Sequence, residues 1–112
     1  MKEKLENLVK SVLSIPCETV FTKLVVPSAT YSFYNINPVL FGDGECTEET
    51  ESVQVDLWYR TKTERDLAAD KLHKAFKKQR GYTYPYLEKY YDEVARLYRA
   101  TFKFDILKES EE

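Results

Sequence analysis

Alternating apolar and polar positions predict a strand in the middle of the chain. Between residues 51 and 61 an apolar side chain recurs at every second position, and β-branched and aromatic residues are frequent, as is typical of a half-buried strand. The apolar set consists of Val53, Val55, Leu57 and Tyr59. We expect this segment to be the central strand of a sheet, with that set facing the core.

The pattern then changes to a helical period over residues 63–80. Its apolar face consists of Ala68, Leu72, Ala75 and Phe76, with Leu67 at the edge. Thr63 suits the N-terminal cap and Asp66 the first turn, while Gly81 suits the position after the last turn. The sequence therefore predicts that the central strand leads into a helix through a tight turn, and that Leu72 is buried.

A second amphipathic helix is predicted over residues 2–14. Its apolar positions lie three or four residues apart, at Leu5, Leu8, Val9, Val12 and Leu13. Pro16 prevents its continuation. Because a helix this short is marginal by itself, we expect it to pack on the sheet.

Residues 19–37 are predicted to form strands, and residues 38–50 an acidic connection. Within the first range, Val20 to Val26 is extended between two prolines, and Ala29 to Ile36 is rich in aromatic strand formers. Glycine and aspartate at residues 42–44 favour a turn, and the acids oppose sheet pairing and burial. We expect either an exposed, mobile connection or a hairpin that projects from the body and ends in the central strand.

The last third of the chain supports two interpretations. Residues 86–98 fit a helical period, yet residues 82–107 also fit a hairpin with its turn at residues 92–93. The tyrosine content and Pro85 favour the hairpin, whereas the glutamate, lysine, alanine and arginine content favours the helix. We take the hairpin as the prediction and expect residues 108–112 to be frayed.

Together these elements predict an α+β fold, with a mostly antiparallel sheet of about four or five strands packed against an N-terminal and a central helix. A length of 112 residues suits one domain over residues 1–112. The two cysteines, Cys17 and Cys46, are too few for a disulfide scaffold. The apolar runs are too short to span a membrane, so we expect a soluble protein.

Residue types that commonly carry catalysis or metal binding are sparse in this chain. His73 is the only histidine and is expected on the helix surface. A zinc site is implausible without a CxxC pair or a second histidine, and the Asp43-Gly44-Glu45 segment lacks the ligand spacing of a calcium loop. With no phosphate-binding loop or nucleophile elbow either, the sequence predicts no enzyme, no cofactor and no metal.

Charge is distributed unevenly, although the net charge is only −2. Five acids and no base lie between Asp43 and Glu51, whereas eight bases and three acids lie between Arg60 and Arg80. One interpretation is a solvated loop and a solvated helix face. The other is an interface in which the acidic segment of one copy meets the basic helix of the next. The candidate interface residues are Asp43, Glu45, Glu48, Glu49, Lys71, Lys74, Lys77 and Lys78.

The order of segments along the chain carries a family resemblance. An amphipathic helix precedes the strand ATYSFYNINP, the acidic loop FGDGE, the strand VQVDLWYRTK, the helix RDLAADKLHKAF and the segment GYTYPYLEKYYDEVARLYRATFKFDI. This order, which covers nearly the whole chain, resembles the small tail-terminator, or tail-completion, proteins of long-tailed bacteriophages and prophages.

The resemblance implies a structural role in the virion. Members of the family look like α+β subunits with helices on one side of a sheet, and they assemble, commonly as hexameric rings, on the end of the tail tube. The implied partners are further copies of the chain, the tail-tube protein and the head connector or neck protein, with assembly in the bacterial cytoplasm. The resemblance implies no cofactor, no membrane and no specific nucleic acid.

Two alternative functions follow from the same sequence. A head–tail connector or head-completion (neck) protein is similar in size to a tail terminator. A small nucleic-acid-binding module is suggested by the basic helix beside Tyr82 and Tyr84, because aromatic side chains next to bases can stack on nucleobases. The net negative charge opposes tight binding to a duplex.

Overall fold

The computed structural model of the chain describes residues 2–19, 25–40 and 46–109. Within these ranges the chain forms two helices and a five-stranded sheet. In chain order the elements are α1 (Lys2–Leu13), β1 (Cys17–Glu18), β2 (Ser28–Leu40), β3 (Cys46–Tyr59), α2 (Lys62–Lys78), β4 (Tyr86–Asp92) and β5 (Leu97–Glu109).

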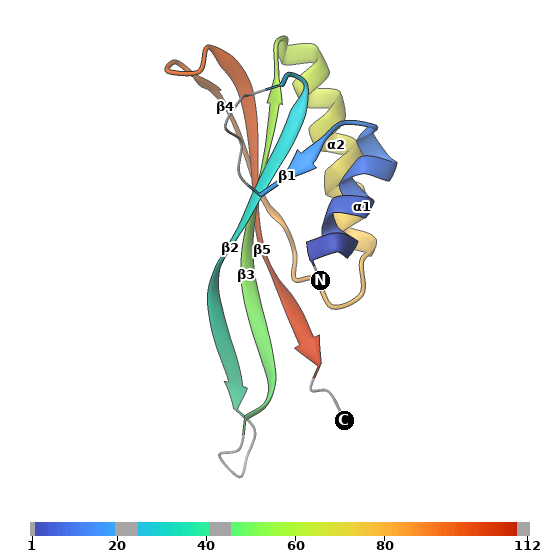
Figure 1. Ribbon diagram of the computed structural model, residues 1–112, viewed down its shortest axis with the longest axis vertical. Coiled ribbons are helices and arrows are strands. Elements are labelled where there is room, and N and C mark those ends of the chain that lie inside the picture. The colour runs from blue at the N-terminus through green and yellow to red at the C-terminus, as the bar shows by residue number, and fades with distance from the viewer. Residues whose placement is uncertain (1, 20–24, 41–45, 110–112) are drawn as a thin grey trace.

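The sheet has the strand order β1-β2-β3-β5-β4, so that β3 is the central strand, as predicted. The short β1 pairs parallel with β2, and every other neighbouring pair is antiparallel. Both helices cover the same face of the sheet, and no helix of the described residues lies on the other face (Figure 1). The predicted α+β fold is confirmed.

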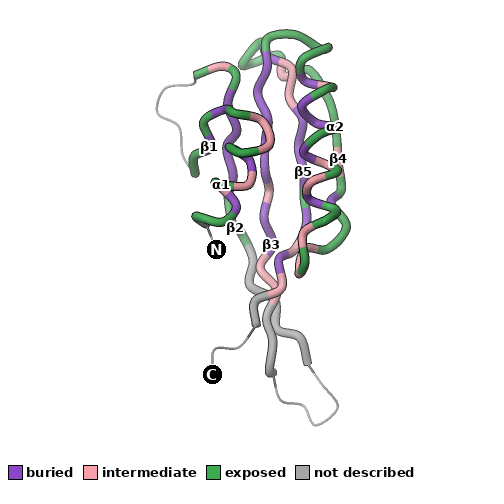
Figure 2. The backbone as a smooth tube through the Cα atoms, turned by 90° about the vertical axis from the view of Figure 1, so that its right-hand side faces the viewer, coloured by how far each residue is buried: buried purple, intermediate pink, exposed green. Residues whose placement is uncertain are grey.

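The core lies between that face of the sheet and the two helices. The predicted apolar set of β3 is buried, and Leu72 and Phe76 of α2 are fully buried against it. From α1, Leu5 and Val9 are fully buried, while the expected Leu8 and Val12 pack at the edge. Figure 2 shows how buried positions concentrate along β3 and β5. The helix faces predicted from periodicity are therefore confirmed.

The connection predicted at residues 38–50 is largely strand. β2 and β3 continue as a long hairpin that projects past both helices, with Pro38 opposite Glu49 and Val39 opposite Glu48 (Figure 1). The expected alternative of a projecting hairpin is thus confirmed, and the expectation that the acids oppose pairing is wrong for Glu48 and Glu49. Their backbone is held in ladders by β2 on one side and β5 on the other, which outweighs the low strand propensity of glutamate. The predicted turn at residues 42–44 lies outside the described residues.

The predicted strand over residues 20–26 is not found where it can be compared. Residues 20–24 lie outside the described residues, and Val25 and Val26 are not in a strand. The strand of this region is instead β1, which precedes the predicted range.

The start of α2 differs from the prediction by its capping residue. Thr61, not Thr63, is the N-cap: its Oγ1 accepts a hydrogen bond from the backbone N–H of Glu64 at 3.2 Å and donates one to the Glu64 carboxylate at 2.8 Å. Threonine followed three residues later by glutamate is a capping box, so the local signal favoured Thr61. The helix ends at Lys78, and Gly81 follows with a positive φ of 86°.

The C-terminal segment is the predicted hairpin, and the alternative helix over residues 86–98 is wrong. β4 and β5 pair along the whole length of β4. The turn lies at residues 93–96, one residue later than expected, and Asp92 stabilises it by accepting a hydrogen bond from the N–H of Ala95 at 2.9 Å. β5 continues to Glu109, so the expected fraying is wrong for residues 108 and 109, whereas residues 110–112 lie outside the described residues.

Candidate functional site

The lysines of the predicted interface lie on the exposed side of α2. Lys71, Lys74, Lys77 and Lys78 are all solvent-exposed. Lys74 forms an ion pair with Asp70, one helical turn away, at 3.3 Å, and both side chains are about two-thirds exposed. An exposed pair of this kind stabilises a fold little, so these charges remain available to another molecule.

The acids of the predicted interface are placed only in part. Asp43 and Glu45 lie outside the described residues. Glu48 and Glu49 lie near the start of β3, where it pairs with the end of β2, and this β2–β3 hairpin projects past α2 (Figure 1). The structure thus gathers the four lysines on one helix and carries Glu48 and Glu49 outward on a different element.

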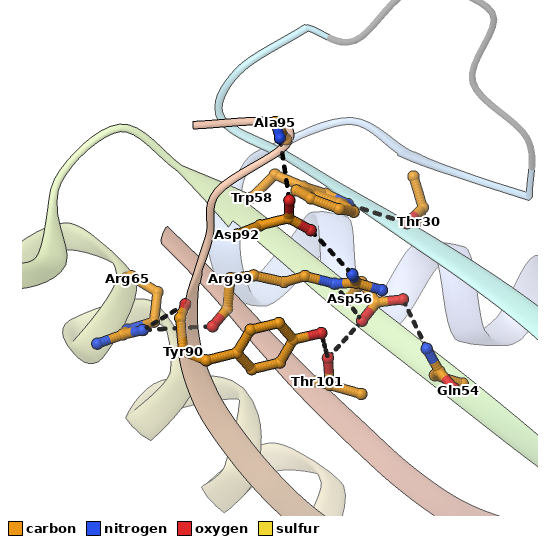
Figure 3. A network of polar contacts seen from close by, with 10 residues as sticks. All are labelled: Thr30, Gln54, Asp56, Trp58, Arg65, Tyr90, Asp92, Ala95, Arg99 and Thr101. Atoms are coloured by element: carbon orange, nitrogen blue, oxygen red, sulfur yellow. Dashed lines mark hydrogen bonds and ion pairs between the residues drawn. The ribbon is translucent and has the colours of Figure 1, made fainter. Parts of the chain in front are cut away.

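The sheet face without helices carries a polar network that the sequence analysis did not anticipate. Its centre is the carboxylate of Asp56 on β3 (Figure 3). Asp56 Oδ1 accepts hydrogen bonds from Arg99 Nε at 3.0 Å and from Thr101 Oγ1 at 2.6 Å, and its Oδ2 accepts one from Gln54 Nε2 at 3.0 Å. The hydroxyl of Tyr90 lies 3.2 Å from Thr101 Oγ1. Since the only proton of that threonine hydroxyl is donated to Asp56, Tyr90 is the donor in this contact.

Arg99 joins three strands through this network. Its Nη1 lies 3.2 Å from Asp92 Oδ2 at the end of β4, and its guanidinium stacks on Trp58 and Tyr90, with 4.5 Å and 5.4 Å to the ring centroids. Burial, the largest single cause, lowers the pKa of Arg99, but the hydrogen bond and charge of Asp56, together with Tyr90 and Asp92, outweigh burial and raise this pKa above its usual value. Conversely, the pKa of Asp92 is lowered, first by the N–H of Ala95 and then by Arg99, against the opposing effect of burial.

The contacts of this network connect three neighbouring strands, β3, β5 and β4. Both oxygens of Asp56 and both oxygens of Asp92 accept hydrogen bonds, so each carboxylate is already engaged within the fold. Among the described residues, no three histidine, cysteine or acidic side chains are grouped so that they could hold a metal ion. The network therefore has a structural effect: its hydrogen bonds and ion pairs hold β4 and β5 against β3.

Arg65 makes a second tie, between α2 and the C-terminal hairpin. In the sequence Arg65 is one of the eight bases between Arg60 and Arg80, yet its side chain is buried. Its Nη1 donates hydrogen bonds to the carbonyl oxygens of Tyr90 at 3.1 Å and Arg99 at 3.3 Å, and its Nε pairs with Asp66 at 2.7 Å. This arginine therefore holds the hairpin and leaves the basic surface to the lysines.

The two tyrosines proposed to stack on nucleobases have different environments. Tyr82 is partly buried and packs against the core, with its ring centroid 5.0 Å from that of Phe104, and burial raises its pKa. Tyr84 is exposed, and its ring makes a T-shaped contact with the ring of His73, with the two centroids 5.6 Å apart. His73 Nε2 lies 3.0 Å from the carbonyl oxygen of Pro85, an acceptor, so this nitrogen carries the proton. Tyr82 and Tyr84 therefore do not form an exposed platform on which nucleobases could stack.

The two cysteines lie on different strands, Cys17 on β1 and Cys46 on β3. Cys17 is free and buried under α1, and burial is the main cause that raises its pKa to about 12. A thiol with so high a pKa is a poor nucleophile near neutral pH. The surroundings of the Cys46 side chain are not described.

Exposed tyrosines gather around β4. Four tyrosines are exposed on or next to this edge strand: Tyr84, Tyr86, Tyr90 and Tyr91. Tyr34 is exposed on β2, which lies toward the opposite edge of the sheet. A separate shallow groove of ≈ 220 Å³ lies between the two helices, where the exposed Leu67 joins Val12 and Leu13. Tyrosine is enriched in protein–protein interfaces, so the strand edges are the stronger candidates for contact with another molecule.

Comparison with known proteins adds no identification to this geometry. No protein-family model matches the chain, and no curated protein matches it. Within the part of the chain that the structure describes, no helix is long and apolar enough to cross a membrane.

Proposed function

We propose that this chain is a structural subunit of a long-tailed phage or prophage, of the tail-terminator type. It forms a ring on the end of the tail tube, stops tube growth and presents a surface to the head connector. The proposal starts from the resemblance of its segments to that family, and the α+β fold with helices on one face agrees with it. Assembly takes place in the bacterial cytoplasm, and the mature location is the virion.

The observation that carries the proposal is the projecting β2–β3 hairpin. It extends past both helices, and β5 accompanies it as far as the pair Glu48–Glu109 (Figure 1). A small group of strands is stable when another element covers its apolar face, and neither α1 nor α2, the two helices of the described residues, covers this part of the hairpin. A neighbouring subunit or the tail tube would supply the missing cover.

Opposite charges supply the register of the ring in this proposal. The acids Asp43, Glu45, Glu48 and Glu49 of one subunit approach the exposed lysines Lys71, Lys74, Lys77 and Lys78 of the next. Each exposed pair contributes only about 0–1 kcal/mol, so the charges select the register while apolar and tyrosine contacts supply the affinity. Association should therefore weaken as salt increases, because salt screens exposed charges.

The test combines solution mass with electron microscopy. The purified protein, alone and with the tail-tube protein encoded in the same genome, should form rings and tubes capped at one end. The variant Lys74→Glu/Lys78→Glu should lose rings and caps while keeping its fold, and Lys74→Gln/Lys78→Gln serves as the matched control that removes charge without reversing it.

Three outcomes would contradict parts of the proposal. If the charge-reversed variant assembles as well as the wild type at low salt, the lysine contact is wrong. If the wild type neither forms rings nor changes tube length, the terminator function is wrong. Binding to the head connector without any effect on tube growth would assign the chain to the neck instead.

A further inference from the structure

The outer edge of β2 lacks the charged side chains that commonly protect an exposed strand. β1 pairs only with Ala29 and Thr30, so from Ser32 to Leu40 the outer side of β2 has no strand partner among the described residues. These nine consecutive residues contain no charged side chain. Natural edge strands are commonly blunted by charges, especially lysine, as well as by bulges and proline. Between Ser32 and Leu40 the strand has Pro38 and two irregularities in its register with β3, after Phe33 and after Val39, but no charge that would oppose pairing with another strand.

The opposite edge of the sheet is formed by β4, which is also free on its outer side within the described structure. Its seven residues pair only with β5. Exposed tyrosines flank this edge: Tyr86 and Tyr90 are exposed on β4 itself, and Tyr84 just before it. Tyr90 contacts Arg99 and Thr101, and Tyr84 contacts His73, so Tyr86 is the tyrosine whose large, rigid side chain can cover a strand laid alongside β4.

The strand directions allow these two edges to join. β3 runs antiparallel to both β2 and β5, and β4 runs antiparallel to β5. Consequently β2 and β5 point one way, and β3 and β4 point the other way. A β4 strand from a neighbour in the same orientation would therefore lie antiparallel to β2 and continue the alternation. The helices of both copies would remain on one side of the joined sheet.

Charge opposes the pairing of β4 with a second β4. An antiparallel pair centred on Lys89 sets this lysine against itself, and one centred on Glu88 does the same for the glutamate. A pair centred on Tyr90 sets Glu88 against Asp92. Like charges directly opposite each other are destabilising. The uncharged edge of β2 creates no such conflict in any register.

We propose that the outer edge of β2, from Ser32 to Leu40, pairs with the outer edge of β4 of a second copy, so that one sheet continues from subunit to subunit. The inference rests on the proposed ring and names its main contact. Because the join uses two different edges, it is heterologous and repeats until the ring closes. Within one copy Tyr86 pairs with Lys103, Lys103 with Gln54 and Gln54 with Ser32, so the start of β4 lies at the height of Ser32. For its β4 to pair with Ser32 to Leu40, the neighbour must therefore be displaced along the strands. A closed sheet accommodates such a displacement by tilting its strands against the ring axis.

The test uses one aspartate substitution on each edge. Tyr34→Asp places a charge on β2, Tyr86→Asp places one on β4, and Leu67→Asp on α2 is the matched control. The three wild-type side chains are similarly exposed, at 51%, 61% and 63%, so all three variants should fold, which circular dichroism checks. Each edge variant alone should lose the ring and remain a monomer, while the control keeps the ring.

The mixture of the two edge variants is decisive. The Tyr34→Asp variant keeps an unchanged β4 edge, and the Tyr86→Asp variant keeps an unchanged β2 edge. These two unchanged edges can still pair with each other. Native mass spectrometry of the equimolar mixture should show a one-to-one heterodimer that cannot grow further.

The outcomes separate this inference from the proposed function. Rings that survive both edge substitutions overturn the edge pairing and leave the terminator function standing. If Tyr34→Asp alone abolishes assembly and the mixture forms no heterodimer, two β2 edges pair with each other and the inference is wrong. A wild-type protein that forms no ring, alone or with tail tubes, overturns the proposed function and the edge pairing together.

Discussion

Replacing Arg99 with methionine tests whether the polar network holds the sheet together. The substitution keeps an unbranched side chain of similar reach that can still contact the rings of Trp58 and Tyr90. It removes the two charged hydrogen bonds, to Asp56 at 3.0 Å and to Asp92 at 3.2 Å. It also leaves both carboxylates without their arginine.

The expected cost follows from these contacts. A hydrogen bond to a charged group contributes about 1.5–3 kcal/mol, and a cation–π contact about 0.5–1 kcal/mol at exposed sites. The side chain of Arg99 is 21% exposed, so solvent weakens each contribution, and contributions of neighbouring contacts do not add fully. We therefore expect Arg99→Met to lower the free energy of unfolding by about 2–4 kcal/mol near neutral pH.

Urea unfolding followed by fluorescence measures this loss. Trp58 is the only tryptophan and stacks on Arg99, so its emission reports on the network itself. Lys103→Met is the control, because Lys103 lies on the same strand and the same face but is exposed. It should change the free energy of unfolding by less than about 0.5 kcal/mol.

Acid should reduce the difference between Arg99→Met and the wild type. The pKa of Asp92 is lowered in the folded state, so the stability it contributes is fully present above the unfolded carboxyl value of about 3.9. That stability is lost as the pH falls through the lower folded value, where Asp92 is protonated and no longer pairs with Arg99. An Arg99→Met variant as stable as Lys103→Met near neutral pH would refute the reasoning.

Further predictions concern the core and the start of α2. Leu72 is fully buried, so Leu72→Ala should lower the free energy of unfolding by about 2–5 kcal/mol, whereas Leu67→Ala on the exposed side of the same helix should cost less than about 0.5 kcal/mol in urea unfolding. Equal losses would contradict the assigned helix face. Thr61→Ala should cost about 1 kcal/mol in thermal unfolding because it removes the N-cap, and Thr63→Ala should cost much less. The reverse order would place the cap at Thr63.

Much of the local structure was predictable because burial imposes a period on the sequence. Alternation identified β3, and the three-to-four-residue repeat identified both helices and the burial of Leu72. The C-terminal hairpin was predictable from its tyrosine content, although a helical period competed with it. The correct cap of α2 was also present as a local signal, in Thr61 and Glu64.

The candidate surfaces depend on strand order, which local patterns do not contain. Asp56 meets Arg99 across 43 positions of sequence because β5 lies between β3 and β4. In the sequence Arg99 is one polar position of an alternating strand, and nothing local assigns it a partner. Arg65 was similarly indistinguishable from the lysines around it until the hairpin packed over it.

The sequence by itself determined which faces of the helices and of β3 are buried, because the spacing of apolar residues along an element shows which of its faces is buried. Only the tertiary structure decided that Glu48 and Glu49 lie in a strand, because ladders from β2 and β5 hold a backbone that local propensity would leave as a loop. It also decided which strand edges remain free, since an edge is defined by the strands that do not pair with it. Pairing energies act between distant segments, and this is why the polar network and the edges of β2 and β4 emerge only from the folded chain.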